Sequence, residues 1–301
     1  MSPAQKVIKY FAFAFAVSLM VTILSSILMV ISSVSDGKFL FASEKNYINF
    51  TKEFENVENL DITNYSGKIY VQSGNVDKIM VEAINVPDSY IAKVTNQTLV
   101  IKDNGRGNFI FNLWLFGDYR EKETKITITL PQSIQFKKVE FDNGSGSMEL
   151  SGFQTESFYL DGGSGAIIVS NIRANDTNIS TGSGGVALEK VSLSNGYINT
   201  GSGAVNIADS DLARIDFDTG SGSLNFEGLL LGKCNVDGGS GSLAFDINQE
   251  IENYDLRFDS GSGGIWVNGK RRDDQDIRNE EANNILTVEG GSGEVAINFA
   301  K

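Results

Sequence analysis

Acidic residues recur at a fixed place beside a repeated glycine-rich triplet. The triplet Gly-Ser-Gly begins at residues 144, 163, 182, 201, 220, 239, 261 and 291. Two positions before each triplet lies a mostly acidic column that consists of Asp142, Asp161, Ser180, Asn199, Asp218, Asp237, Asp259 and Glu289. Three kinds of chemistry use such residues. Glycine-rich loops cradle phosphates, carboxylates in repeat proteins bind calcium, and paired carboxylates cleave glycosidic bonds.

The simplest interpretation of the acidic column is structural. Asp, Asn and Ser hydrogen-bond nearby backbone amides in turns, so each side chain could cap the corner that follows it. Calcium-binding repeats of the G-G-x-G-x-D type need an Asp shortly after the glycines, whereas the fifth position of every repeat here is apolar. Calcium binding is therefore the alternative, and the sequence predicts no metal site and no cofactor.

The composition favours a protein that is not an enzyme. The chain has no histidine, which excludes Ser-His-Asp and Cys-His catalysis and zinc sites built on imidazole. No column of Lys or Arg adjoins the acidic column, so a polysaccharide-active enzyme is a remote alternative without catalytic residues to name. The single cysteine, Cys234, falls in an apolar column, and we expect it to be buried and inert.

An N-terminal apolar segment predicts a membrane anchor. Residues 10–34 carry no charge, and about 20 apolar residues are enough to cross a bilayer as a helix. Lys6 and Lys9 precede the segment and Asp36 is the first charge after it. This charge pattern keeps the N-terminus in the cytoplasm and exports the rest of the chain. A cleaved signal peptide is the alternative, although its apolar run is usually only about 7–15 residues long.

The predicted organisation follows from this anchor. Residues 1–9 form a cytoplasmic tail, 10–34 the transmembrane helix, 35–46 a juxtamembrane linker and 47–301 an extracellular domain. The net charge of the chain is −13, which argues against nucleic acid as a partner because phosphate binding needs a basic surface.

The Gly-Ser-Gly triplets mark an internal repeat. Five successive intervals are 19 residues long, and the last two are 22 and 30. Positions 5 and 7 of each repeat are apolar and form two columns: Met148/Leu150, Ile167/Val169, Val186/Leu188, Val205/Ile207, Leu224/Phe226, Leu243/Phe245, Ile265/Val267 and Val295/Ile297. A spacing of two indicates strands whose alternate side chains face one side. The sequence predicts an all-β fold, a parallel β-helix (β-solenoid) of about 19 residues per rung.

The triplets are then corners between rungs. Glycine allows a backbone with φ > 0 and relieves crowding between stacked corners. The predicted ladder of structural turns contains Gly144, Gly163, Gly182, Gly201, Gly220, Gly239, Gly261 and Gly291 together with Asp142, Asp161, Asp218, Asp237 and Asp259. Regular repeats span 132–301, and 47–131 is predicted to form irregular early rungs.

Two segments interrupt the repeats. Residues 105–123 contain seven large apolar residues within eight positions, among them Phe111, Trp114 and Phe116. This loop either closes the end of the solenoid or contacts a partner or the membrane surface. Trp266 is a large residue at an outward position, and we include it as a possible contact. The charged segment 268–284 is predicted to be a solvated loop.

These features together resemble a bacterial family of adhesin-like proteins with β-strand (GSG) repeats, whose function is unknown. The matching segments are FENVENLDI (54–62), KITITLP (125–131), VNGK (267–270) and GGSGEVAINF (290–299). The resemblance covers roughly residues 44–301 and implies a right-handed parallel β-helix, often tethered to the membrane and facing outside. No catalytic residue belongs to the pattern of this family.

The leading functional hypothesis is a membrane-anchored, non-enzymatic surface module that binds an envelope or cell-surface macromolecule. A surface glycan or an envelope protein is the expected partner, with outward side chains such as Tyr159 and Tyr197 as sugar contacts. The alternative is an accessory or sensor protein of a cell-envelope stress response. Its cytoplasmic tail is too short to hold a signalling domain, so it would need a membrane partner.

Overall fold

The computed structural model describes residues 20–22, 25, 46–64, 66–104 and 123–300. The chain divides into two compact units, and the larger one comprises residues 47–107 and 119–301. The predicted anchor at 10–34 belongs to the other unit and lies outside the described residues, apart from helical residues 20–22 and 25. Within the described part, no helix is both long and apolar enough to span a bilayer.

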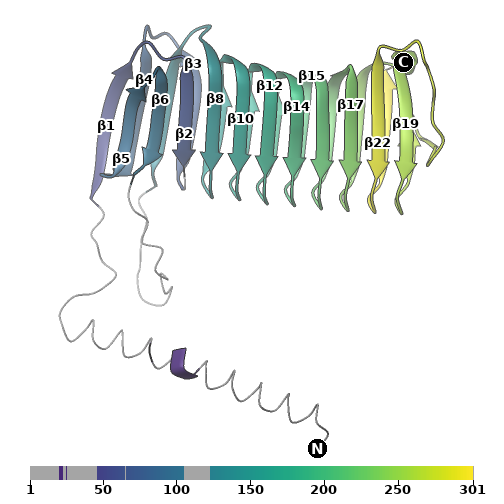
Figure 1. Cartoon of the computed structure of the whole chain (residues 1–301), viewed down its shortest axis with the longest axis horizontal. Helices are drawn as coiled ribbons and strands as arrows, with labels where there is room; N and C mark the ends of the chain where they lie inside the picture. Colours follow the sequence, from purple (N-terminus) through teal and green to yellow (C-terminus); the bar gives the residue numbers. More distant parts are fainter. Residues whose placement is uncertain (1–19, 23–24, 26–45, 65, 105–122, 301) are drawn as a thin grey trace, which may run out of the picture. The chain divides into compact units, whose positions relative to one another are not determined.

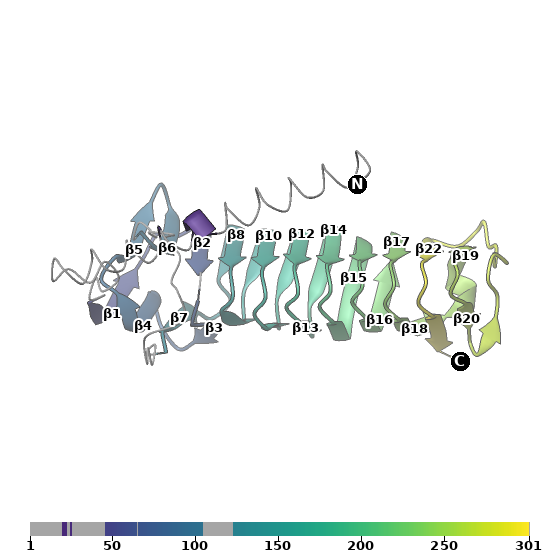
Figure 2. The ribbon, with the colours of Figure 1, turned by 90° about the horizontal axis from the view of Figure 1, so that it is seen from below.

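The larger unit is an all-β solenoid with two main faces (Figures 1 and 2). The first face contains β2 (Asn59–Asn64), β6 (Thr98–Asp103), β8 (Gln135–Asn143), β10 (Gln154–Gly162), β12 (Arg173–Thr181), β14 (Ser192–Thr200), the second half of β15 (Val205–Thr219), β17 (Lys233–Gly238), β19 (Tyr254–Ser260) and β22 (Asn284–Gly290). The second face contains β3 (Lys68–Gly74), β7 (Lys125–Pro131), β9 (Ser147–Ser151), β11 (Ile167–Ser170), β13 (Val186–Glu189), the first half of β15, β16 (Leu224–Leu231), β18 (Leu243–Glu250), β20 (Ile265–Val267) and β23 (Val295–Ala300).

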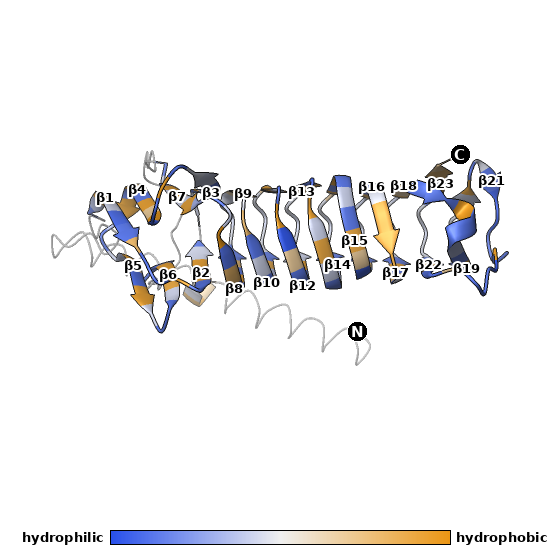
Figure 3. Cartoon of the chain, turned by 90° about the horizontal axis from the view of Figure 1, so that it is seen from above, coloured by the Kyte–Doolittle hydropathy of each residue, from blue (hydrophilic) through white to orange (hydrophobic). Residues whose placement is uncertain are grey.

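Neighbouring rungs pair in parallel and in the predicted register. Ile167 of β11 aligns with Val186 of β13, which aligns with Val205 of β15. Every residue of the two apolar columns at positions 5 and 7 is at most 2% exposed. Hydrophilic and hydrophobic residues alternate along the strands (Figure 3), because alternate side chains point into the shared core. The predicted β-solenoid is therefore confirmed.

The N-terminal end of the solenoid departs from the order of the chain. β2 pairs in parallel with β8 on one side and with β6 on the other, and β3 pairs likewise with β9 and β7. The rung made by β6 and β7 thus lies outside the rung made by β2 and β3. Antiparallel strands complete this end: β1 (Tyr47–Phe54) pairs with β4 (Ile79–Pro87), β4 with β7, and β5 (Tyr90–Thr95) with β6.

The C-terminal end corrects the expectation that each rung stacks on the next rung in sequence. β22 lies between β17 and β19 (Figure 1). On the second face, β23 lies between β18 and β20. The last rung of the sequence is therefore inserted between two rungs that precede it in the sequence. A 3₁₀ turn, η1 (Ile251–Asn253), and the short strand β21 (Lys270–Arg271), antiparallel to β20, complete this end.

The glycines of the corners are required for close approach and not for a left-handed backbone. None of the Gly-Ser-Gly glycines has a φ in the left-handed region, so the predicted role of φ > 0 at these corners is wrong. A Cβ atom on Gly165 would overlap the carbonyl oxygen of Gly146, and one on Gly184 would overlap the carbonyl oxygen of Gly165. Stacked backbones therefore leave no room for a side chain at the third position of the triplet.

A set of residues with positive φ lies instead at the opposite turn, at position 9 of successive repeats. They are Gly152 (φ 79°), Asn171 (φ 53°), Lys190 (φ 54°), Asp209 (φ 50°) and Gly228 (φ 150°). Gly and Asn adopt this conformation at little cost, but Lys does not favour it. The positive φ at this position was not recognised from the sequence, because the column mixes Gly, Asn and Asp with Lys190, which does not favour it.

Candidate functional site: the outer surface of the first face

The acidic column lies on the outer surface of the first face. Asp161 aligns with Asp142, and Asp237 aligns with Asp218. Asp142, Asp161, Asp218, Asp237 and Asp259 are all exposed. Partial burial and the charges of neighbouring Asp161, Glu140 and Asp61 raise the pKa of Asp142, as expected where carboxylates are stacked from rung to rung.

These acids do not cap the corners, which corrects the sequence-based interpretation. The N–H of Gly163 donates to the carbonyl oxygen of Asn143 (2.7 Å), and the N–H of Ser164 donates to that of Gly144 (2.9 Å). The same rung-to-rung pattern recurs at the corners of Gly182, Gly201, Gly220 and Gly239. Because backbone carbonyls already satisfy the corner amides, the carboxylates are left to face solvent.

At the first regular corner, the side chain that does bind the corner belongs to the next residue, Asn143, which the sequence analysis missed. Nδ2 of Asn143 donates to the carbonyl oxygen of Gly146 (2.6 Å), and Nδ2 of Asn64 donates to Oδ1 of Asn143 (3.1 Å). Both asparagines are at most 2% exposed. The contact does not recur at the later corners, where the same position holds Gly162, Thr181, Thr200, Thr219 and Gly238, and the hydroxyls of Thr181 and Thr200 are buried without a hydrogen-bond partner among the described residues.

A shallow hollow of about 420 Å³ opens on the outer surface across β14, β15, β17 and β22. We call it the outer hollow. Its outward side chains form two columns that run from rung to rung. The first column is Tyr197, Asp216, Asn235 and Thr287, and the second is Asn199, Asp218, Asp237 and Glu289.

The outer hollow is polar, with one aromatic ring at its border. Tyr197 is 46% exposed. Oδ1 of Asp216 accepts hydrogen bonds from Nδ2 of Asn235 (2.6 Å) and from the backbone N–H of the same residue (3.2 Å), which fixes both side chains. Among the described residues, no ion pair involves Asp218, Asp237 or Glu289.

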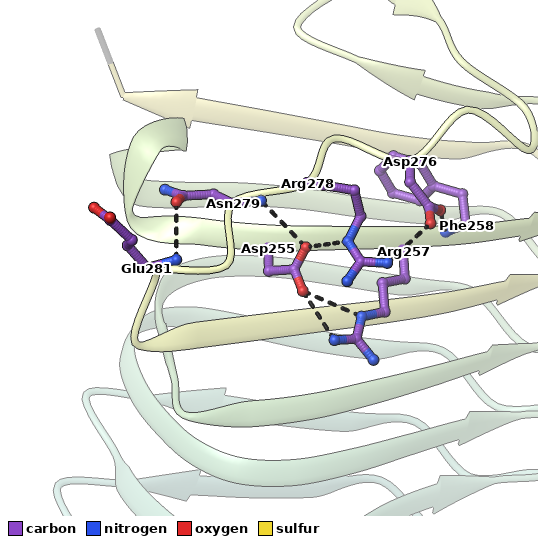
Figure 4. A network of polar contacts seen from close by, with 7 residues as sticks. All are labelled: Asp255, Arg257, Phe258, Asp276, Arg278, Asn279 and Glu281. Carbon is purple, nitrogen blue, oxygen red and sulfur yellow. Dashed lines mark hydrogen bonds and ion pairs between the residues drawn. The ribbon is translucent and has the colours of Figure 1, made fainter.

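A network of charged residues covers the exposed edge of the terminal strand β19 (Figure 4). Asp255 is 3% exposed and pairs with Arg257 (2.9 Å) and Arg278 (2.8 Å). Burial opposes its charge, but hydrogen bonds from Arg257 and the Asn279 amide and the charge of Arg278 hold the pKa of Asp255 below its ordinary value. This network holds the 268–284 segment against the solenoid.

The 268–284 segment is therefore not the freely solvated loop that its charge suggested. The backbone N–H of Phe258 donates to Oδ1 of Asp276 (2.9 Å), and that of Ser260 donates to Oδ1 of Asp274 (2.7 Å). Ile277 forms an antiparallel bridge with Leu256. Free N–H groups on an edge strand invite pairing with another chain, and here carboxylates and backbone occupy them.

The remaining predicted residues are spread over the chain. Phe111, Trp114 and Phe116 lie outside the described residues. Trp266 is partly exposed on the terminal strand β20, where it aligns with Arg271 of β21. β20 belongs to the second face, whereas the outer hollow lies on the first. Cys234 is 1% exposed, as predicted, and burial raises the pKa of its thiol. The described residues contain no group of three or more His, Cys, Asp or Glu side chains placed to hold a metal ion.

The chain is similar to several solved structures. A putative adhesin from Bacteroides fragilis NCTC 9343 is 14% identical, with a TM-score of 0.49, and the match covers 84% of this chain and 98% of that one. A putative cell adhesion protein from Clostridium sporogenes ATCC 15579 is 17% identical, with a TM-score of 0.31, covering 85% of this chain and 100% of that one. A putative lipid binding protein from Parabacteroides distasonis ATCC 8503 is 17% identical, with a TM-score of 0.42, covering 85% and 98%.

No curated protein matches the sequence. The Toastrack DUF4097 family matches residues 57–298, which span the rungs, the corners and the terminal strands described above. The resemblance noted in the sequence is thereby confirmed, and the chain belongs to the Toastrack DUF4097 family.

Proposed function

We propose that this protein is a membrane-anchored, outward-facing and non-enzymatic binding module that attaches to a macromolecule of the cell envelope or of a neighbouring cell surface. The observation that carries the proposal is the outer surface of the first face, where polar side chains repeat in register from rung to rung around the outer hollow. Solenoids present such extended surfaces to large partners, because each rung repeats the same positions.

The membrane anchor is proposed from the sequence and from where the chain joins the solenoid. Tyr47, the first residue of β1, aligns with Pro87 at the end of β4. Oγ1 of Thr124, where the chain returns from the aromatic segment 105–122, donates to the carbonyl oxygen of Asn85 (2.9 Å). Both connections therefore meet the solenoid at one edge of its N-terminal end. The anchor proposed at 10–34 precedes β1 in the chain, so it would tether the solenoid through β1.

The absence of catalysis is part of the proposal and is supported by the residues at the surface. The lining of the outer hollow contains carboxylates, amides, Tyr197 and Thr287, but no Lys or Arg. Glycosidases pair a carboxylate nucleophile or base with a carboxylic acid that is protonated through a raised pKa. The exposed carboxylates on β15, β17 and β22 do not provide two such unequal environments.

Two measurements on the full chain test the proposal. In the first, membranes from expressing bacteria are washed with alkaline carbonate. The chain should remain in the membrane, and the double variant Leu19→Arg/Leu24→Arg should be released. In the second, the detergent-solubilised chain is mixed with isolated cell-envelope material and sedimented. We expect saturable co-sedimentation, with the heat-unfolded chain as control. Release of the unaltered chain by carbonate, or the lack of saturable binding, would contradict the proposal.

A further inference from the structure

We propose that the outer hollow binds a glycan chain without acidic groups, which lies along the solenoid axis across β14, β15, β17 and β22. This inference rests on the proposed binding function and names the ligand class of the same surface. Three features support it: the hollow itself, the exposed aromatic ring at its border and the in-register arrangement of its hydrogen-bonding groups.

The aromatic ring provides the apolar part of the contact. Tyr197 borders the hollow and is 46% exposed. The faces of sugar rings carry C–H groups that pack on aromatic rings, while the tyrosine hydroxyl keeps a polar tip for hydrogen bonding. Tyrosine combines these properties with little conformational entropy to lose on binding.

The polar side chains provide acceptors for hydroxyl groups. Asp216 uses Oδ1 to hold Asn235, so Oδ2 of Asp216 and Oδ1 of Asn235 remain as acceptors in a fixed arrangement. The carboxylates of Asp218 and Asp237 lie one column away and align with each other. Hydrogen bonds from hydroxyls to carboxylates are charge-assisted and among the stronger ones. A polyhydroxylated ligand matches a surface in which acceptors outnumber donors.

The repeat of the surface matches a polymer. Strands in a sheet are about 4.8 Å apart, which is close to the length of one sugar ring along a glycan chain. Tyr197, Asp216, Asn235 and Thr287 occupy equivalent positions on four successive strands. A glycan lying along the axis would place about one sugar residue on each rung, and the rigid sheet would need little ordering on binding.

The charge of the surface selects the class of glycan. Asp216, Asp218, Asp237 and Glu289 line the hollow, and no Lys or Arg does. The nearby Arg214 donates its Nε–H to Oδ1 of Asn195 (2.7 Å) in a neighbouring column. Carboxylates or sulfates on a ligand would meet like charges, whereas neutral and amino sugars would not.

The experiment measures binding of the purified full chain in detergent micelles to three immobilised polysaccharides: a neutral β-glucan, chitosan and alginate. We expect saturable binding to the first or the second and none to alginate. Tyr197→Ala should weaken binding about three- to tenfold, as expected for loss of an aromatic contact. The matched control is Tyr159→Ala. Tyr159 was also predicted from the sequence as a sugar contact, but it lies in the same column two rungs away, outside the outer hollow. Asp237→Asn should weaken binding in the same way, with Asp161→Asn as its control.

Two results overturn the inference. One is tighter binding to alginate than to the other two polysaccharides. The other is equal loss of binding in Tyr197→Ala and Tyr159→Ala, or no loss in either. If the unaltered chain binds none of the three but still co-sediments saturably with envelope material, the glycan site is wrong and the binding function stands. If co-sedimentation fails as well, the proposed function itself is contradicted.

Discussion

Ser292, in the last corner of the chain, stacks on Gly239: its backbone N–H donates a hydrogen bond of 2.9 Å to the carbonyl oxygen of that glycine. The corner at Gly261 comes between them in the sequence but not in space, since the N–H of Gly261 donates to the carbonyl oxygen of Gly290 (2.7 Å). The rung made by β22 and β23 therefore lies between the rung of β17 and β18 and the terminal rung of β19 and β20. It joins the terminal rung to the rest of the solenoid.

Deletion of residues 284–301 should destabilise the solenoid strongly. It removes buried residues of β22 and β23, including Leu286, Val288 and Ile297, and leaves β19 and β20 without their parallel partners. The loss should approach the whole stability of a domain, about 5–15 kcal/mol. Thermal unfolding followed by circular dichroism measures it. A melting temperature lowered by only a few degrees would instead show that β19 and β20 can stack directly on β17 and β18.

Gly165→Ala should destabilise the protein by about 1–3 kcal/mol or more, because the added methyl group overlaps the carbonyl oxygen of Gly146 and forces stacked backbones apart. Gly185→Ala is the matched control. Its Cβ would have the carbonyl oxygen of Ala204 as nearest neighbour, at an ordinary 3.7 Å. Urea unfolding of the two variants gives the comparison. Equal stability of both would show that close approach does not explain the glycine.

Phe226→Ala should cost about 3–5 kcal/mol. Phe226 is 2% exposed, and its ring centroid lies 6.0 Å from that of Phe245 inside the core. Asn225→Ala changes the exposed neighbour on the same strand and should have little effect. Denaturant unfolding distinguishes them, and a Phe226→Ala protein as stable as the Asn225→Ala protein would contradict the assignment of the inward column.

Asp255→Asn should lower stability at neutral pH by about 2 kcal/mol. This is less than the loss for a fully buried ion pair, because the side chains of Arg257 and Arg278 are 42% and 48% exposed. A carboxyl group whose pKa is lower in the folded state stabilises the fold above its unfolded pKa. That stability is lost as the pH falls through the lower folded value.

The stability difference between the Asp255→Asn variant and the unaltered chain should therefore shrink as the pH falls below about 4, since the ordinary pKa of aspartate is 3.8. Urea unfolding at pH 7, 5 and 3.5 provides the measurement, with the exposed Glu280→Gln as control. A difference that stays constant or grows towards acid pH would contradict the role given to the charge.

The features predictable from the sequence are those that repeat. Positions 5 and 7 of each repeat fixed the register, as Ile167 and Val186 show, because burial of a strand face leaves a strict period of two. The order of the terminal rungs was not predictable. β19 and β22 carry the same inward pattern, Leu256/Phe258 and Leu286/Val288, so either could follow β17.

The candidate site was predictable only in part. Tyr197 was recognised as an outward residue, whereas the acidic column was predicted to cap the corners. The outer hollow also combines four strands that are not consecutive in sequence, since β22 follows β17 in space. The capping role also fell to Asn143 in place of Asp142. Asn143 points inward at the corner and Asp142 points outward. The alternation of the strand ends at the corner, so it did not predict which of the two adjacent side chains points inward.

The most direct test of the account is whether the solenoid faces the outside of the cell. Ser240→Cys places a thiol on an exposed corner, and the only native cysteine, Cys234, is buried. Protoplasts or spheroplasts that carry the full-length variant are treated with a membrane-impermeant maleimide. The account predicts labelling of intact cells that depends on Ser240→Cys and does not increase on lysis. Labelling that appears only after lysis would place the solenoid in the cytoplasm and contradict the proposed function.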